Sequence, residues 1–139
     1  MKISAKGRYA LRIMVDIATA NKEYVSITEI ANRQEISVKY LEQIIAKLLK
    51  ANLLTSLRGS LGGYKLVKTP QEYSLEQILR VTGDLPQLAP CSNSGNCPRL
   101  AKCTTAGCYV ALSGLIMDFL AKTTLQDLVD KTFAVGWQN

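Results

Sequence analysis

The chain has 139 residues, of which 47% are hydrophobic and 20% charged, so it can bury a core and does not have the composition of a disordered protein. It contains no histidine. This excludes histidine-based acid–base catalysis, nucleophiles activated by histidine, and histidine metal ligands. No apolar run approaches the roughly 18 residues of a membrane span. We therefore expect no histidine-based chemistry and no membrane protein, and the pattern of elements described below predicts that the chain is not an enzyme.

Positive charge is concentrated in the first half of the chain. Residues 1–68 hold 12 Lys/Arg and 5 Asp/Glu, a net charge of +7, whereas residues 69–139 have a net charge of −1. A basic half joined to a nearly neutral half is typical of a nucleic-acid module with an attached sensing or assembly module. Lysines scattered over solvated helix faces would give the same totals. The positions of the charges in the expected elements therefore decide between a nucleic-acid module and an ordinary solvated surface.

The first expected element is a helix over residues 8–21, where apolar residues recur at helical spacing. Its start is basic and then apolar, as in a secretion signal. However, Arg12 and Asp16 interrupt the apolar stretch, and no convincing small-residue cleavage site follows. We interpret this segment as the first helix of a cytoplasmic protein.

Two further helices joined by a tight turn are predicted next. Ser26 and Glu29 form a capping box for a helix over about 27–34, and Ser37 caps a longer helix. The apolar stripe of the longer helix comprises Leu41, Ile44, Ile45, Leu48 and Leu49. Its opposite face is polar and basic, with Lys39, Tyr40, Glu42, Gln43, Lys47 and Lys50. This is the helix-turn-helix pattern, whereas a helical hairpin in a core would not require hydrogen-bonding side chains along the first two turns.

A β-hairpin is predicted directly after this helix pair. Residues 54–57 and 64–67 have the pattern of strands, and a glycine-rich loop of residues 58–63 joins them. The glycines allow positive φ and close approach to another backbone, and Arg58 lies where it can reach a minor groove or phosphates. An ordinary surface hairpin is the simpler interpretation elsewhere, but after a helix-turn-helix the pattern indicates a wing.

The second half of the chain is predicted to contain a cofactor-binding loop and a helix that forms the dimer. A helix over 75–83 begins at the capping signal of Ser74 and Gln77, and a polar, cysteine-rich loop follows. The helix over 108–121 is apolar on nearly all sides, so we expect a partner subunit to cover its second face. A short helix is expected at about 124–131. The fold class is mostly α with a small β-hairpin: a winged helix-turn-helix plus a long dimerisation helix.

Three segments follow from these patterns. Residues 1–83 are predicted to form the winged helix-turn-helix DNA-binding domain, residues 84–107 a cysteine-rich cofactor loop, and residues 108–139 the dimerisation helix and C-terminal tail.

All four cysteines lie within 18 residues, as Cys91, Cys97, Cys103 and Cys108 with the spacing C-x5-C-x5-C-x4-C. Thiolates converging from one loop suit a soft metal or an iron–sulfur cluster. Zinc sites usually have gaps of two to four residues, and disulfides suit secreted proteins. The residues alone therefore favour an iron–sulfur cluster and leave zinc and thiol-redox chemistry open.

Three stretches resemble the Rrf-two family of bacterial transcription regulators: MKISAKGRYALRIMVDIA at 1–18, ISVKYLEQIIAKL at 36–48 and LLTSLRGSLGGYKL at 53–66. The similarity runs over nearly the whole chain, and the motifs YLEQ and RG-x-x-GGY in this order are quite specific. The C-x5-C-x5-C loop resembles the branch of the iron–sulfur cluster regulators, the IscR-like branch.

The resemblance implies a homodimer, crossed through the apolar helix, that binds double-stranded DNA at an imperfect palindrome. It implies an iron–sulfur cluster on Cys91, Cys97 and Cys103, with 2Fe–2S preferred to 4Fe–4S, and no small-molecule substrate. The positions that match the family's DNA contacts are Ser37, Lys39, Tyr40, Glu42, Gln43 and Arg58.

The fourth cluster ligand departs from the family pattern. The positions at which relatives carry a histidine or an aspartate ligand are Ala106 and Arg8 here. Cys108 is the obvious candidate, and a carboxylate of the partner chain or a small molecule are the alternatives. Zinc or a thiol-redox switch on the same cysteines stays the second interpretation. A small iron–sulfur carrier is the third, although a carrier has no use for a wing.

Overall fold

The first three helices each begin at a serine cap. The computed structural model, which describes residues 2–93 and 95–133, places α1 at Ala5–Thr19, α2 at Ile27–Gln34 and α3 at Val38–Lys50. The hydroxyls of Ser4, Ser26 and Ser37 accept hydrogen bonds from backbone N–H groups of the first turns. The predicted capping box of Ser26 and Glu29 is complete. α1 starts at Ala5 and not at the predicted residue 8, because the Ser4 hydroxyl accepts the N–H of Gly7 and caps the helix there.

The turn between α2 and α3 is tight, as predicted. Glu35 ends α2 in the left-handed conformation with φ of 55°, and Ile36 is buried before Ser37 starts α3. Four residues of the predicted stripe, Leu41, Ile44, Ile45 and Leu48, are buried. The helix-turn-helix pattern is therefore present in three dimensions.

The wing is a two-stranded antiparallel hairpin of β1 (Leu54–Leu57) and β2 (Gly63–Leu66), with Leu54 opposite Leu66. Strand β2 is joined to the segment before α2 near the loop end of the hairpin, because Val25 and Tyr64 exchange backbone N–H···O bonds of 2.9 and 2.8 Å. Gly63 has φ of 148°, and a Cβ there would lie 2.3 Å from the carbonyl oxygen of Val25. Only glycine fits such a crossing.

Behind the wing the chain passes through a single 3-10 turn, η1 (Pro70–Glu72), into α4 (Leu75–Thr82). The hydroxyl of Ser74 accepts the N–H of Gln77, which is one of the two bonds of the predicted capping box. Gly83 ends α4 with φ of 78°.

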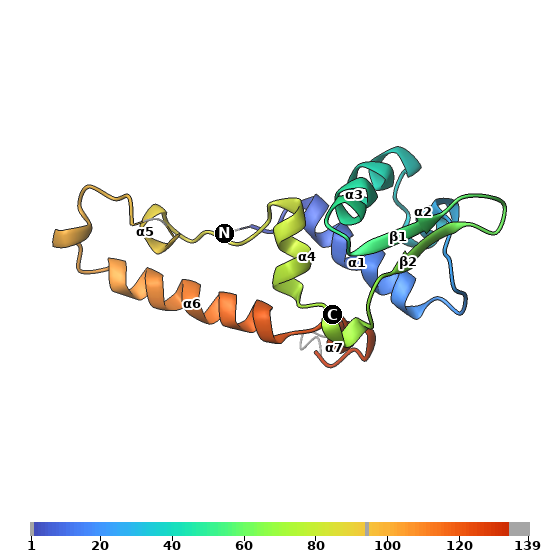
Figure 1. The fold of residues 1–139 in the computed structure, drawn as a ribbon. Coiled ribbons are helices and arrows are strands. Elements are labelled where there is room, and N and C mark those ends of the chain that lie inside the picture. Colours follow the sequence, from blue (N-terminus) through green and yellow to red (C-terminus); the bar gives the residue numbers. More distant parts are fainter. Residues whose placement is uncertain (1, 94, 134–139) are drawn as a thin grey trace, which may run out of the picture.

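One core lies between α1, α2, α3, α4 and the hairpin (Figure 1). The ring of Tyr73 is its largest fully buried side chain. Its hydroxyl donates to the carbonyl of Leu53 at 2.9 Å and accepts the N–H of Lys68 at 2.8 Å. Leu125 of the C-terminal helix α7 (Leu125–Val129) belongs to the same core. The chain end thus returns to the winged body, although sequence order assigned it to the dimerisation segment. Residues 134–139 of the predicted tail lie outside the described residues.

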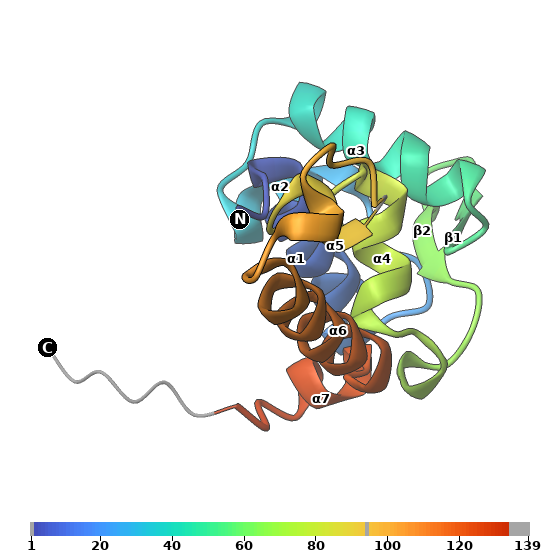
Figure 2. The ribbon, with the colours of Figure 1, turned by 90° about the vertical axis from the view of Figure 1, so that its left-hand side faces the viewer.

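The second half contains two short turns and one long helix. α5 (Pro90–Asn93) and η2 (Leu100–Lys102) interrupt the predicted loop, and α6 spans Ala106–Lys122. α6 packs beside α4 and α5, as Figure 2 shows from the end of the molecule. Its far end extends away from the winged body (Figure 1). None of the helices in the described part of the chain combines the length and the hydropathy that crossing a bilayer demands.

The C-terminal end of α6 is fastened to the winged body. Leu120 packs with Leu75 and Leu79 of α4. Just beyond α6, the carbonyl of Thr123 accepts the N–H of Leu75, and the N–H of Leu125 donates to the carbonyl of Tyr73, both at 2.9 Å. These bonds form a short bridge between the start of α4 and the end of α6.

α6 buries little of its surface within one chain. Only three of its residues are buried, although the helix is apolar on nearly all sides. Its exposed large apolar side chains are Tyr109, Val110, Leu112, Leu115 and Phe119. An exposed apolar face of this size marks an interaction surface.

Candidate nucleic-acid interface and cysteine loop

The outer face of α3 presents the predicted base-reading side chains to solvent. Lys39, Glu42 and Gln43 are exposed, and Lys47 and Lys50 follow on later turns of the same helix. Such a face can donate to and accept from base edges while its lysines attract phosphates.

The two other predicted contacts on α3 have structural roles as well. The hydroxyl of Ser37 caps the helix by accepting the N–H of Tyr40 at 3.3 Å. Tyr40 is half-buried and lies edge-to-face on Tyr9, with 5.7 Å between the ring centres. The guanidinium of Arg12 covers the Tyr9 ring at 5.2 Å. This stack fixes the first turn of α3 against α1.

A buried carboxylate holds α1 to the end of α2. The Asp16 side chain is only 3% exposed. It accepts hydrogen bonds from Nε and Nη2 of Arg33 at 3.0 and 2.6 Å and from the Gln34 amide at 2.7 Å. Arg12 adds bonds to the side chain and carbonyl of Gln34, the last residue of α2. The clamp sits immediately before the turn at Glu35, so it sets the direction in which α3 leaves α2.

Sequence reasoning missed this clamp because it treated Asp16 only as an interruption of an apolar stretch. The available signal was an acidic residue on the inner side of α1 together with an Arg-Gln pair at the end of a helix expected to pack on it.

The wing projects Arg58 and its neighbours into solvent. Arg58 is exposed at the end of β1, and Leu61 in the loop is 88% exposed. Lys65 of β2 pairs with Glu23 at 2.7 Å, which fastens β2 to the segment before α2. The predicted wing cation is thus presented outward from an anchored hairpin.

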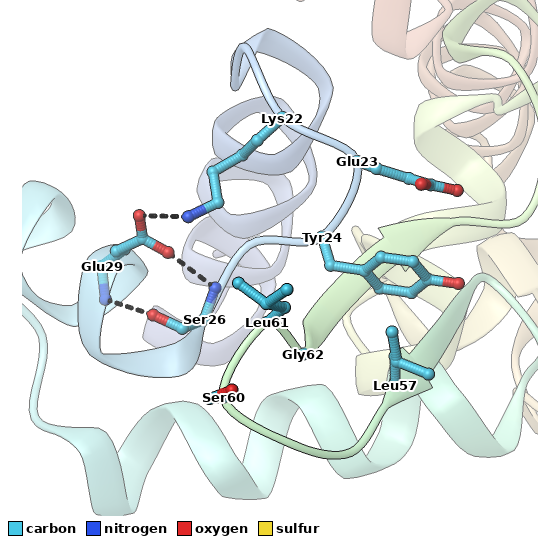
Figure 3. A pocket seen from close by; sticks show the side chains of 9 residues that line it. All are labelled: Lys22, Glu23, Tyr24, Ser26, Glu29, Leu57, Ser60, Leu61 and Gly62. Carbon is cyan, nitrogen blue, oxygen red and sulfur yellow. Dashed lines mark hydrogen bonds and ion pairs between the residues drawn. The ribbon is translucent and has the colours of Figure 1, made fainter.

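A groove of about 620 Å³ separates the wing from the start of α2 (Figure 3). Tyr24, Leu57 and Leu61 line its apolar part. On the opposite side Lys22 pairs with Glu29 at 2.7 Å. The Lys22 hydrogen bond, followed by those of the Ser26 backbone and hydroxyl, lowers the pKa of Glu29 to about 2. The carboxylate of the cap therefore stays ionised far below neutral pH.

Three cysteines lie in the cysteine loop and the fourth, Cys108, lies in the first turn of α6; none is in a disulfide, and their exposures differ. Cys91 and Cys97 are half-buried, whereas Cys103 and Cys108 are exposed. The sulfur of Cys103 lies 3.3 Å from the Thr105 hydroxyl at the start of α6. That hydroxyl and the backbone N–H groups of Thr105 and Ala106 lower the pKa of the Cys103 thiol. This environment increases the fraction of thiolate, the form that binds soft metals and reacts with oxidants, relative to an ordinary cysteine.

The donor chemistry of the loop fits a thiolate-bound metal or cluster, but its described conformation does not gather the donors. Within residues 2–93 and 95–133, no three Cys, Asp or Glu side chains lie close enough to hold one metal ion. Joining Cys91, Cys97 and Cys103 at one centre requires the loop to rearrange. Ala106 is only 5% exposed and has no donor atom, and the Arg8 guanidinium donates to the carbonyl of Ile3 at 3.0 Å. Neither position supplies a fourth ligand.

The start of the loop is tied to the first helix. The Asp84 carboxylate accepts the backbone N–H of Ser4 at 2.9 Å and its hydroxyl at 2.8 Å. Burial raises the pKa of Asp84, but hydrogen bonds from Ser4, Thr82 and Gly7 outweigh it and hold the pKa below its usual value. A Cβ at Gly7 would come within 2.9 Å of this carboxylate. The residue that leads into the cysteine loop is therefore fixed to the start of α1.

Comparison with known proteins agrees with this architecture. The model of the Rrf2 family, described as an iron-dependent transcriptional regulator, matches residues 3–131. The HTH-type transcriptional regulator IscR of Vibrio vulnificus is 37% identical over 130 residues, which are 93% of this chain and 77% of that protein.

Two solved structures resemble the chain over nearly its full length. CymR of B. subtilis, the global cysteine regulator of that organism, has a TM-score of 0.78 and 31% identity to this chain, and the similarity covers 96% of this chain and 99% of CymR. IscR of T. potens has a TM-score of 0.75 and 30% identity and covers 100% of this chain and 93% of its own. The predicted fold class, mostly helical with a wing hairpin, is confirmed, and these relatives are regulators and not enzymes. The chain belongs to the Rrf2 (Rrf-two) family of DNA-binding transcriptional regulators.

Proposed function

We propose that the chain is a cytoplasmic, homodimeric regulator whose affinity for a palindromic operator depends on an iron–sulfur cluster on Cys91, Cys97 and Cys103. One observation carries the DNA-binding part of this proposal. The polar face of α3 is exposed opposite an apolar stripe in which Leu41, Ile44, Ile45 and Leu48 are buried, beside a wing that presents Arg58. The proposal keeps the three segments 1–83, 84–107 and 108–139 as DNA-binding, cofactor and dimerisation parts, with α7 packed back on the first.

The proposed base contacts follow from the exposed side chains of α3. The Gln43 amide suits adenine, Glu42 accepts from the amino group of cytosine, and Lys39 suits guanine or a phosphate. Arg58 on the wing suits a narrow minor groove. Ser37 and Tyr40 position the helix through the cap and the Tyr9 stack and lie close enough to its N-terminus to touch phosphates.

We expect Gln43→Ala to relax base preference at one position of each half-site. One bidentate contact is worth about 1–3 kcal/mol of discrimination, and the exposed Gln43 makes no contribution to the core. The measurement is selection of binding sites from a random DNA pool by the variant and the unmodified protein. Lys50→Ala, also exposed, should lower affinity without changing the selected sequence. An unchanged selection for Gln43→Ala would remove the assignment.

The exposed apolar face of α6 supports the homodimer. It lies next to the loop and on the side of α6 away from α4, so a second copy could cover it while leaving both α3 helices exposed. Two copies related by a two-fold axis read two inverted half-sites, which is why the operator is proposed to be palindromic.

The loop residues supply thiolate ligands for the proposed cluster, of the 2Fe–2S type, with Cys108 as the candidate fourth ligand. When bound, such a cluster supplies a redox- and iron-sensitive charge centre held by thiolates. The sulfur of Cys103 contacts the Thr105 hydroxyl at the start of α6, and Asp84 ties the start of the loop to α1. Reordering of residues 84–107 therefore acts on both the DNA-binding body and α6.

The test is a strictly anaerobic preparation analysed by ultraviolet–visible absorption and by iron, acid-labile sulfide and zinc content. Absorption bands at roughly 320–420 nm with iron and sulfide are expected, and Cys97→Ala should lose both. Lys102→Ala, in the same loop, should keep them. Colourless, iron-free unmodified protein from such a preparation would overturn the cluster and leave the regulator.

A thiol-redox switch on the same cysteines is the second candidate, with zinc retention as its alternative form. The lowered pKa and the exposure of Cys103 favour it, because an exposed thiolate is the form that oxidants attack. Operator affinity that changes with peroxide in iron-free protein, and no longer does so in Cys103→Ser, would support this candidate over the cluster.

A further inference from the structure

The tip of the wing has a backbone path that leaves little freedom. A Cβ on Gly62 would lie 2.0 Å from the carbonyl oxygen of Leu57, and one on Gly63 would lie 2.3 Å from that of Val25. The N–H of Gly62 donates to the carbonyl of Gly59 at 3.0 Å and closes the turn. The direction in which residues 58–61 project is therefore set by the backbone and by the bonds between Val25 and Tyr64.

Leu61 is the apolar side chain that this loop projects. It is 88% exposed, more than any other large apolar side chain in the described part of the chain. Figure 3 shows it on the loop at the mouth of the groove beside the start of α2. An exposed leucine contributes almost nothing to the core, so the Leu61 side chain is available for a contact made in a complex.

The neighbouring charge identifies the kind of surface that Leu61 meets. Arg58 begins the same loop and, in the proposed function, lies in a minor groove. The walls of a minor groove are deoxyribose C–H groups, and its floor at an A·T pair carries no amino group. At a G·C pair the N2 amino group of guanine projects into the groove. An apolar side chain would cover that donor and leave it without a hydrogen-bond partner, which is unfavourable.

We propose that Leu61 is a second minor-groove contact of the wing and that it selects A·T over G·C pairs beside the site of Arg58. The inference rests on the proposed DNA binding and deepens it. Arg58 supplies the ionic part of the contact, whereas Leu61 supplies a non-ionic part that excludes the guanine amino group. Discrimination between A·T and G·C pairs under the wing then depends on Leu61. Because this contact is not ionic, it does not change how steeply binding depends on salt concentration.

The test uses the operator selected by the unmodified protein and measures binding by fluorescence anisotropy at several salt concentrations. Replacing the A·T pairs under the wing by G·C should weaken binding about tenfold. Inosine·cytosine pairs, which lack the N2 amino group, should restore it. Leu61→Ala should weaken binding to the A·T operator about tenfold, remove most of the difference between A·T and G·C, and leave the salt slope unchanged.

Two matched variants separate the possible outcomes. Ser60→Ala, in the same exposed loop, should behave as the unmodified protein, and Arg58→Ala should lower both the affinity and the salt slope. Unchanged affinity and unchanged base preference in Leu61→Ala, with normal operator binding by the unmodified protein, would overturn the inference and keep the proposed function. Failure of the unmodified protein to select any DNA would instead overturn the proposed function.

Discussion

Replacing Arg33 by methionine is expected to lower the free energy of unfolding by about 3 kcal/mol. The Asp16 side chain is 3% exposed and accepts two of its three hydrogen bonds from this guanidinium. In the variant the carboxylate stays buried with only the Gln34 amide as a donor. Methionine keeps the apolar stem of arginine, so the change isolates the loss of the charged group. Urea denaturation followed by circular dichroism measures the effect.

The control for this prediction is the opposite half of the pair. Asp16→Asn removes the charge from the buried side, and the Arg33 side chain, 45% exposed, can regain hydration. We therefore expect this variant to lose only about 1–2 kcal/mol. If Asp16→Asn lowers the free energy of unfolding as much as Arg33→Met does, the clamp as described is wrong. The effect of each substitution would then not depend on whether the charge left behind is buried or exposed.

Placing an aspartate at position 115 is expected to dissociate the proposed homodimer. Leu115 is 70% exposed on α6, so the substitution costs little within one chain. In a dimer joined along α6, each protomer would bury an unpaired carboxylate, and the dissociation constant should rise about a hundredfold or more. Sedimentation velocity over a range of concentrations measures the change, and the operator affinity should fall with the loss of the second half-site.

Val67→Asp is the matched control, because Val67 is also an exposed apolar residue but lies beyond the wing strands and away from α6. It carries the same change of charge and should leave the dissociation constant unchanged. If Leu115→Asp sediments as the unmodified protein does, or if the unmodified protein is a monomer at all concentrations, α6 is not the dimer surface.

The winged helix-turn-helix could be read from the sequence because each of its parts has a local cause. Ser26 with Glu29 and Ser37 with the following stripe determine where helices begin, and the spacing of Leu41, Ile44 and Ile45 determines which face is buried. Glycines mark the hairpin loop because two of them have backbone contacts that no side chain could occupy. Caps, helical spacing and loop glycines each depend on a few neighbouring residues, so they can be recognised in the sequence without knowing the rest of the fold.

The features that sequence reasoning missed depend on contacts between distant segments. The partners of Asp16 lie 17 and 18 residues away, and Leu125 joins a core formed mostly by the first 80 residues. Neither helical periodicity nor capping chemistry carries such information. The cysteine spacing, likewise, predicts ligands but not how the loop folds. α5 begins at Pro90, and both α5 and η2 include local backbone hydrogen bonds to the carbonyls of Ala89 and Cys97. The polar composition of the loop did not indicate these short helical turns.

The hydrogen bond between Thr123 and Leu75 fixes the C-terminal end of α6 to the start of α4. The 17 residues of α6 form a rod of about 25 Å from this fixed point to the cysteine loop at its far end. A displacement of about 2 Å at the loop corresponds to a turn of only about 5° around Thr123, by the length of such a rod. In the proposed homodimer, joined along α6, such a turn would change the positions of both winged bodies. If the proposed homodimer and cluster are both present, the long helix would act as a lever that converts a rearrangement of a few loop residues into a change in the angle between the two winged bodies.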